Sequence, residues 1–317
     1  MALNAIPKTE QANIDLGAID QMDEADAVAA MVNSHLAAAE IVSSKAALIS
    51  AAANKVTNTI NRGGRVFYCG AGSSGLMALA DALEIPGTFG IDKSQIRILL
   101  AEGLNTIESF EASAEDSAEE ADAVFAKQAI RSDDCFLLLS ASGSTPFVME
   151  MAHAAKTAGA ETIAITNNSE SELGRICAIA IDLDTPPEVV AGSTRLGAAT
   201  AQKIVLNSIS TLVGARLGHV YKGHMVNLNA ANSKLRKRAV RIVSAIAETS
   251  DEHAGELLDK TGGDVKTAIL IGFGADDKQQ AERLLFDAQG RLDRALEGIK
   301  GNETSTASGQ RKLGVKK

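Results

Sequence analysis

Aromatic residues, cysteines and positive charge are scarce in this chain of 317 residues. Aromatic residues make up 3% of the sequence and tryptophan is absent, so we expect a core of aliphatic side chains and alanine. Such a core is typical of helices packed closely on a sheet. The three cysteines are scattered in or near apolar runs, which predicts reduced core residues and excludes a disulfide framework.

Acidic residues outnumber basic ones by 40 to 31, which gives a formal net charge of -9. This excess argues against nucleic acid or an anionic membrane as the main partner. The start of the chain lacks the basic and apolar parts of a secretory signal, and no apolar run reaches membrane-span length. We therefore expect a cytoplasmic protein that holds any bound anion with backbone dipoles and a few Arg or Lys side chains.

Five short apolar runs alternate with stretches of helical periodicity. Strands that are apolar on both faces and separated by helices predict an α/β fold, with a parallel sheet covered on both sides. Ligands of such sheets bind at the carboxyl ends of the strands. The expected strands are Val66–Cys69, Ile96–Ala101, Cys135–Ser140, Thr162–Ile165 and Ile179–Leu183.

Changes in this pattern divide the chain into four parts. Residues 1–60 form an N-terminal polar arm followed by long helices, and residues 61–247 hold the sheet with its trailing helices. Short helices broken by glycines predict a small helical module over residues 248–300. Residues 301–317 are polar and predict a flexible tail.

The first predicted strand leads into a loop of glycine and serine, which is followed by a helical pattern from Leu76. A strand, a small-residue loop and a helix point backbone N–H groups toward an anion. The loop is not a Walker motif, because no Gly-Lys-Ser/Thr follows. We expect Gly72, Ser73 and Ser74 to bind a phosphorylated ligand; the alternative is a tight turn that binds nothing.

A second loop of this kind follows the predicted strand that ends at Ser140, and Pro146 suits the first helical turn after it. Two such loops in one sheet are a more specific signal than one, although serine also caps helices without a ligand. The candidate phosphate ligands here are Ser140, Ser142, Ser144 and Thr145.

A third stretch, residues 192–195, is expected to begin a helix. Ser193 and Thr194 offer hydroxyl groups, and Arg195 is one of few basic residues near the loops. Its guanidinium could pair with a phosphate or carboxylate. The alternative is an ion pair between Arg195 and a neighbouring acid.

Two carboxylates are candidates for acid–base chemistry. We expect Glu84 to end the first helix, because Pro86 follows closely, and to be partly buried. Burial and the negative end of a helix both favour the protonated acid. Glu115 lies within a capping signature at residues 113–116, so we expect it in a first helical turn, where the helix dipole would keep it ionised. Such a pair is typical of a proton donor and a base, although Glu84 could be a hydrogen-bonded acid and Glu115 a surface acid.

The helix places Glu84 about 13 Å from the first loop. A sugar phosphate does not easily bridge that span. Either the second loop holds the phosphate, or the first loop serves a site that another subunit completes. We favour a homodimer with composite sites.

These motifs, in this order, resemble the N-acetylmuramic acid 6-phosphate etherase family, whose members have a sugar-isomerase (SIS) domain related to the glucokinase regulatory protein. The resemblance begins at Thr9 and Glu10 and runs to about Gly298. The segments that carry it are GAGSSG at 70–75, DALEIPGTFG at 81–90, EDS at 115–117, SGSTP at 142–146, EVVAGSTRL at 188–196 and AQKIVLN at 201–207.

The resemblance implies a flavodoxin-like parallel sheet, a homodimer, and no metal or other cofactor. It implies removal of D-lactate from N-acetylmuramic acid 6-phosphate, by elimination and then hydration, to leave N-acetylglucosamine 6-phosphate. The active-site acids of the family fall on Glu84, as the proton donor, and Glu115. Its binding motif adds Glu188 to the candidates.

The chain departs from the family where it has Leu76, Ser144 and Gly197 in place of residues that are usually basic. Each lost charged hydrogen bond is worth about 1.5–3 kcal/mol, so the substrate preference is open. The alternatives are a non-catalytic phosphosugar-sensing regulator and a phosphosugar aldose–ketose isomerase.

Overall fold

The computed structural model describes residues 6–101, 103, 124–228 and 233–299. Internal contacts divide the chain into two units: Met1–Glu84 with Asp92–Val213, and Ile85–Ile91 with Gly214–Lys317. This division falls earlier in the chain than the boundary at 247/248 that the sequence suggests. The tail at 301–317 lies outside the described residues.

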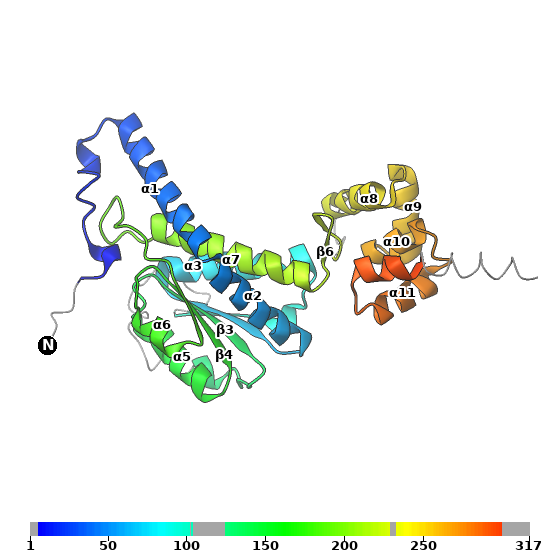
Figure 1. Ribbon diagram of the computed structural model, residues 1–317, viewed down its shortest axis with the longest axis horizontal. Helices are drawn as coiled ribbons and strands as arrows, with labels where there is room; N and C mark the ends of the chain where they lie inside the picture. Colours follow the sequence, from blue (N-terminus) through cyan, green and yellow to red (C-terminus); the bar gives the residue numbers. More distant parts are fainter. Residues whose placement is uncertain (1–5, 102, 104–123, 229–232, 300–317) are drawn as a thin grey trace, which may run out of the picture. The chain divides into compact units, whose positions relative to one another are not determined.

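The first unit contains a five-stranded parallel sheet with the order β2-β1-β3-β4-β5 (Figure 1). The α/β class and the parallel sheet of five strands are thus confirmed. This order is flavodoxin-like, and its connections leave in opposite directions at β1 and β3, which creates a switch point where ligands bind. The strands are β1 (Val66–Gly70), β2 (Ile96–Leu100), β3 (Cys135–Ser140), β4 (Glu161–Thr166) and β5 (Ile179–Asp182).

Helices cover both faces of the sheet, as expected because every residue of the central strands β1 and β3 is buried. On one face, Phe67 of β1 stacks on Phe136 of β3 with ring centroids 4.5 Å apart, in the core beneath α5. The helices that lie wholly or mostly in the first unit include α1 (Glu24–Ser44), α2 (Ala46–Asn61), α3 (Gly72–Phe89), α5 (Pro146–Thr157), α6 (Glu172–Ile176) and α7 (Gly197–Arg216).

A buried carboxylate joins β1, α3 and α7 on the other face of the sheet. Asp81 of α3 accepts hydrogen bonds from the Tyr68 hydroxyl (3.1 Å), Asn207 Nδ2 (2.6 Å) and Ser210 Oγ (3.0 Å). Burial raises the pKa of Asp81, although the three donors oppose this shift. The network fixes α3 against the sheet along the turn that precedes Glu84.

Helix α3 continues through Pro86 to Phe89, so the prediction that Glu84 ends the helix is wrong. A proline removes one intrahelical N–H bond, and the rest of the turn can still form. Gly90 N–H donates to the Pro86 carbonyl (3.0 Å), and Ile85 and Phe89 are both buried. Burial of these two side chains offsets the lost bond.

The N-terminal segment contains the 3-10 helices η1 (Lys8–Glu10) and η2 (Ile19–Gln21). In the part of the chain that the structure describes, no helix by itself has the length and apolar character needed to cross a membrane. Taken together, α1 and α2 pass the same test by length and composition, but they are bent by 68°.

Among the residues that the structure describes, the second unit consists of helices and the short hairpin of β6 (Val220–Tyr221) and β7 (His224–Met225), with the turns that join them. Helix α8 buries Ala239, Val243 and Ile246 in one core with the helices that follow it. It therefore packs as part of the C-terminal helical group. The helices of the second unit include α8 (Ser233–Ala247), α9 (Asp251–Thr261), α10 (Val265–Gly272) and α11 (Lys278–Asp287), and residues 292–299 are helical too.

Candidate functional site

A cavity of about 310 Å³ lies beyond the carboxyl ends of β1 and β3, at the switch point of the sheet. Residues from both predicted loops and from the third stretch meet there. Its lining residues are Thr9, Glu10, Ala71, Gly72, Ser73, Ser74, Ala141, Ser142, Thr145, Gly192 and Thr194.

The first loop is shorter than the sequence suggests, because α3 begins at Gly72 and not at Leu76. Gly75 N–H donates to the Ala71 carbonyl (2.9 Å), so the N–H groups that precede it belong to the open first turn. Ser73 and Ser74 lie in this turn and line the cavity. The arrangement suits an anion, which the N-terminal end of a helix attracts.

Gly70 allows the first turn of α3 to pack directly against the end of β1. A Cβ atom at Gly70 would lie 2.9 Å from both Cα and N of Gly75, closer than packed atoms approach. Any side chain there would push α3 away from β1. The glycine therefore sets the position of the helix end that faces the cavity.

The second loop is organised by hydroxyl groups. Ser140 Oγ accepts a hydrogen bond from Gly143 N–H (2.9 Å) and shares others with Thr145 Oγ1 (2.8 Å) and Ser142 Oγ (3.3 Å). Ser142 and Thr145 line the cavity, whereas Ser140 is buried behind them. Ser144 is exposed outside the lining and donates to Ser142 Oγ (3.2 Å).

The third stretch contributes Gly192 and Thr194 to the lining, but not Ser193 or the exposed Arg195. These residues form turns, so the expected helix start at 192–195 is wrong. Helix α7 begins at Gly197 instead.

Glu188 explains where α7 begins. Its buried carboxylate accepts hydrogen bonds from the N–H groups of Gly197 (2.9 Å) and Ala198 (2.8 Å). A carboxylate at this position satisfies open donors and complements the helix dipole. Glu188 lies outside the cavity lining, so in this structure it supports the third stretch from behind.

The two candidate acids are not brought to the cavity by the described part of the chain. Glu84 is exposed on α3 and lies outside the lining, so the expected partial burial is wrong for this chain by itself. The helix turns the neighbouring Ile85 inward and leaves Leu83 and Glu84 outside. Glu115 lies outside the described residues.

Thr9 and Glu10 line the cavity although no local motif marks them as site residues. The only sequence signal for them was that the family resemblance begins at this dipeptide. Glu10 brings a carboxylate, and none of the described residues that line the cavity is Lys or Arg. The lining is therefore neutral apart from one negative charge.

Metal and thiol chemistry have little support in the described residues. Among them, no group of three His, Cys, Asp or Glu side chains could hold a metal ion. The three cysteines are free, as predicted. Burial raises the pKa of the Cys135 and Cys177 thiols to about 12, which makes them poor nucleophiles.

Comparison with known proteins agrees with this geometry. The model of the SIS domain family matches residues 32–167, which include both serine-containing loops. A phosphoheptose isomerase structure from Francisella tularensis aligns with 61% of this chain and all of its own, at 17% identity and a TM-score of 0.46. The family-model match by itself assigns a SIS domain to residues 32–167.

Relatives extend the match to nearly the whole chain. N-acetylmuramic acid 6-phosphate etherase 2 of Bacillus licheniformis is 37% identical over 290 residues, which cover 92% of this chain and 97% of that protein. The N-acetylmuramic acid 6-phosphate etherase of Streptomyces avermitilis is 37% identical over 288 residues, covering 91% and 93%. The chain belongs to the N-acetylmuramic acid 6-phosphate etherase family.

Proposed function

We propose that the chain is a carbon–oxygen lyase that cleaves the D-lactyl ether of N-acetylmuramic acid 6-phosphate. The products are N-acetylglucosamine 6-phosphate and D-lactate. The observation that carries the proposal is the 37% identity to etherases over more than nine-tenths of the chain. We place the reaction in the cytoplasm, in the breakdown or recycling of cell-wall amino sugars.

The cavity supports a phosphorylated substrate. The N-terminal turns of α3 and α5 both open at it, and Ser73, Ser142 and Thr145 add hydroxyl donors. Backbone N–H groups and the two helix dipoles would hold the phosphate without a cation. This assignment gives the second loop a role equal to that of the first.

In the proposed reaction the sugar is in its open-chain aldehyde form, which acidifies the proton on carbon 2. A carboxylate, which we assign to Glu115, takes that proton, and the electron pair forms a double bond between carbons 2 and 3. The bond from carbon 3 to the lactyl oxygen breaks, and Glu84 donates a proton to the leaving lactate. Water then adds at carbon 3 and a proton returns to carbon 2.

Exposed apolar side chains support a homodimer that completes the site. Val28, Val32 and Leu36 lie on one face of α1 and are 55%, 52% and 58% exposed. Leu83, beside Glu84, is 65% exposed. Apolar patches of this kind mark protein interfaces. In the proposed dimer, Glu84 acts in a site that a second copy of the chain helps to form.

The test is incubation with the lactyl-ether sugar phosphate in water enriched in heavy oxygen. Elimination and hydration place the label at carbon 3 of the sugar and leave the released lactate unlabelled. Label in the lactate would contradict cleavage at carbon 3. Sugar-phosphate binding without turnover would favour the sensing regulator, and isomerisation without lactate release would favour the isomerase.

A Glu84→Gln variant tests the proton donor. We expect its rate of lactate release to fall by about 10²–10⁴-fold, the usual contribution of a positioned acid. Glu150→Gln, on α5 and outside the cavity lining, is the matched control and should keep the parent rate. An unchanged rate in Glu84→Gln would remove Glu84 from the mechanism.

A further inference from the structure

The two residues that precede Glu10 are fixed to the loops that follow β4 and β5. Lys8 N–H donates to Asn168 Oδ1 (2.8 Å), and Lys8 Nζ pairs with Asp184 Oδ2 (3.0 Å). Gly192 N–H donates to the carbonyl of Thr9 (3.0 Å), whose side chain is buried. The fold of the first unit thus sets the position of Glu10.

The Glu10 carboxylate faces the cavity beside Gly192. A Cβ atom added at Gly192 would lie 3.0 Å from Glu10 Oε2, so the absence of a side chain there leaves room for the carboxylate. Gly192 also has φ +76°, a left-handed conformation that favours glycine. None of the described residues makes an ion pair or a hydrogen bond with this carboxylate.

The lining of the cavity offers two kinds of group to a ligand. Serine hydroxyls and the first turns of α3 and α5 suit an anion. Glu10 is the one charged group among the described lining residues, and it repels a phosphate. A carboxylate accepts hydrogen bonds only, so its partner in the ligand is a donor.

We infer that Glu10 contacts the substrate and selects sugar phosphates that present an uncharged donor, an amide N–H or a hydroxyl, on the side away from the phosphate. This inference rests on the proposed function, because it assumes that the cavity holds a sugar phosphate. For the proposed substrate, the amide N–H of the 2-acetamido group is such a donor. Glu10 thereby separates amino-sugar phosphates from inorganic phosphate and small phosphorylated compounds.

The test compares binding by calorimetry in the parent protein and in Glu10→Ala. We expect N-acetylglucosamine 6-phosphate to bind about 10- to 100-fold more weakly to Glu10→Ala, as for a lost charged hydrogen bond. Inorganic phosphate should bind equally well or more tightly, because a like charge has been removed. Glucose 6-phosphate and 2-deoxyglucose 6-phosphate then identify the donor that Glu10 accepts. If Glu10→Ala loses affinity for glucose 6-phosphate but not for the 2-deoxy sugar, a hydroxyl at carbon 2 also serves as the donor.

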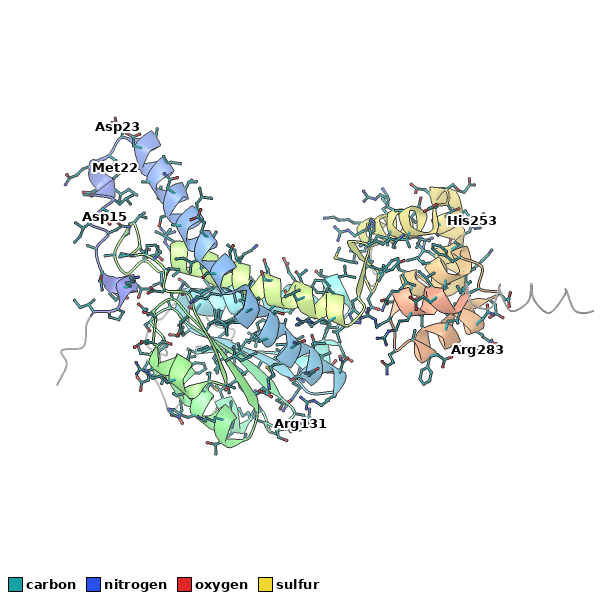
Figure 2. The ribbon with its side chains drawn as sticks, viewed as in Figure 1. Asp15, Met22, Asp23, Arg131, His253 and Arg283 are labelled. Atoms are coloured by element: carbon teal, nitrogen blue, oxygen red, sulfur yellow. The ribbon has the colours of Figure 1, made fainter. Side chains whose placement is uncertain are left out.

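Two further variants keep this test interpretable. Asp15→Ala removes an exposed carboxylate from the same N-terminal segment, outside the cavity lining, and should bind all four ligands like the parent (Figure 2). Glu10→Gln keeps an acceptor oxygen and should lose less affinity for the amino sugar than Glu10→Ala. Thermal unfolding of each variant checks that the fold is intact.

The outcomes separate this inference from the proposed function. An equal change for inorganic phosphate and N-acetylglucosamine 6-phosphate, or no change for either, would overturn the role of Glu10. Lactate release by the parent together with unchanged kcat/KM in Glu10→Ala would uphold the etherase and reject the inference. If Glu10→Ala selectively loses amino-sugar binding while the parent releases no lactate, the inference is upheld and the etherase is rejected.

Discussion

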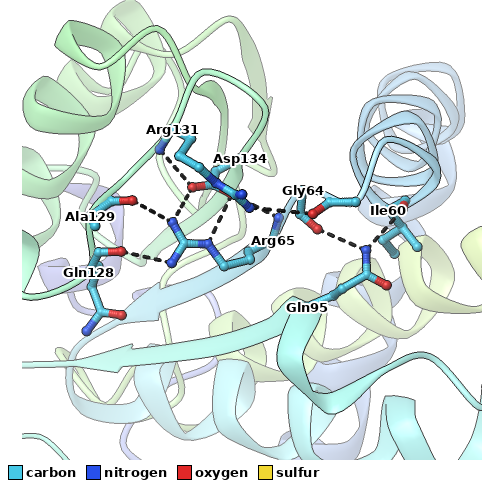
Figure 3. Close-up of polar contacts among 9 residues, drawn as sticks. Ile60, Gly64, Arg65, Gln95, Gln128, Ala129, Arg131 and Asp134 are labelled. Atoms are coloured by element: carbon cyan, nitrogen blue, oxygen red, sulfur yellow. Dashed lines mark hydrogen bonds and ion pairs between the residues drawn. The ribbon is translucent and has the colours of Figure 1, made fainter.

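The amino and carboxyl ends of the same parallel sheet are built in opposite ways. At the amino ends, Asp134 before β3 accepts hydrogen bonds from backbone N–H, Nε and Nη2 of Arg65, which lies just before β1 (Figure 3). Arg131 N–H adds a further donor (2.9 Å). The Arg65 guanidinium also donates to the carbonyls of Gln128 and Ala129, so this edge is closed by the chain's own polar groups.

The start of β2 is tied to the same edge. Gln95, in the 3-10 helix η3 (Lys93–Gln95), donates from Nε2 to the carbonyls of Ile60 and Gly64, both at 3.0 Å (Figure 3). These two bonds join the last turn of α2 and the residue two positions before β1 to the start of β2. Each bond therefore contributes to the stability of the first unit.

At the carboxyl ends, polar groups point into the cavity. The open N–H groups of the first turn of α3 and the hydroxyls of Ser73 and Ser142 face a space that a ligand can fill. The amino ends of the strands therefore serve stability, and the carboxyl ends serve binding. Variants at the two edges should therefore separate unfolding free energy from ligand affinity.

The largest loss of stability should come from Asp134→Ala. Its side chain is 0% exposed and 2.6 Å from Arg65 Nη2. Its removal leaves a largely buried guanidinium without its partner, which costs about 3–5 kcal/mol. Urea unfolding measures the loss, with Asp133→Ala, an exposed neighbour, as the control that should change stability little. Equal losses in both variants would contradict the interpretation that the buried Asp134–Arg65 pair stabilises the amino ends of the strands.

The same carboxylate predicts a dependence of stability on pH. Burial by itself raises the pKa of Asp134, but the hydrogen bonds from Arg65 and Arg131 outweigh it and hold the pKa below its ordinary value. Its stabilising contribution is present above the unfolded-state pKa of about 3.9 and is lost as the pH falls through the folded-state pKa. Acid unfolding of the parent should therefore be steeper below about pH 4 than that of Asp134→Asn.

Gly70→Ala should lower the unfolding free energy by less than Asp134→Ala does, but it should also weaken anion binding. The added Cβ would clash with Gly75, and relief of such overpacking costs about 1–3 kcal/mol. Because the clash moves the first turn of α3, affinity for inorganic phosphate should fall as well. Gly87→Ala on the same helix meets no atom within 4 Å and is the control. Unchanged phosphate affinity in Gly70→Ala would remove this helix end from the anion site.

The sequence predicts the sheet well because its signal is local. Runs such as Cys135–Ser140 are apolar on both faces and bounded by turns, so the strand and its buried position follow from composition. The two serine-containing loops follow from the same pattern, since carboxyl ends of parallel strands meet at one edge.

What the sequence does not predict depends on contacts between distant residues. Glu188 moves the start of α7 to Gly197, and the buried Ile85 and Phe89 carry α3 past Pro86. Neither contact can be predicted from local rules for helix caps and prolines. Glu10 reaches the cavity through a bond between Thr9 and Gly192, which no periodicity reveals.

Ser140→Ala tests how the second loop is held, with a smaller expected effect. The change leaves the buried Gly143 N–H without its acceptor, and we expect a loss of about 1 kcal/mol in unfolding free energy. Phosphate affinity should fall with it, because Thr145 loses the partner that orients its hydroxyl. Ser144→Ala, at the exposed position of the same loop, should change neither quantity. If both variants behave alike, the hydroxyl network does not organise the loop.

The smallest effect should come from Arg131→Ala, at the closed edge itself. Its guanidinium is 54% exposed and lies 3.6 Å from Asp134, whereas the Arg65 side chain is 16% exposed and lies 2.6 Å away. Exposed pairs contribute about 0.2–1 kcal/mol, because solvent screens them and both side chains lose freedom. Since the backbone N–H of residue 131 still bonds to Asp134 in the variant, urea unfolding should show a loss within that range. A loss as large as that of Arg65→Ala would mean that charge alone, and not burial with hydrogen bonding, holds the amino edge together.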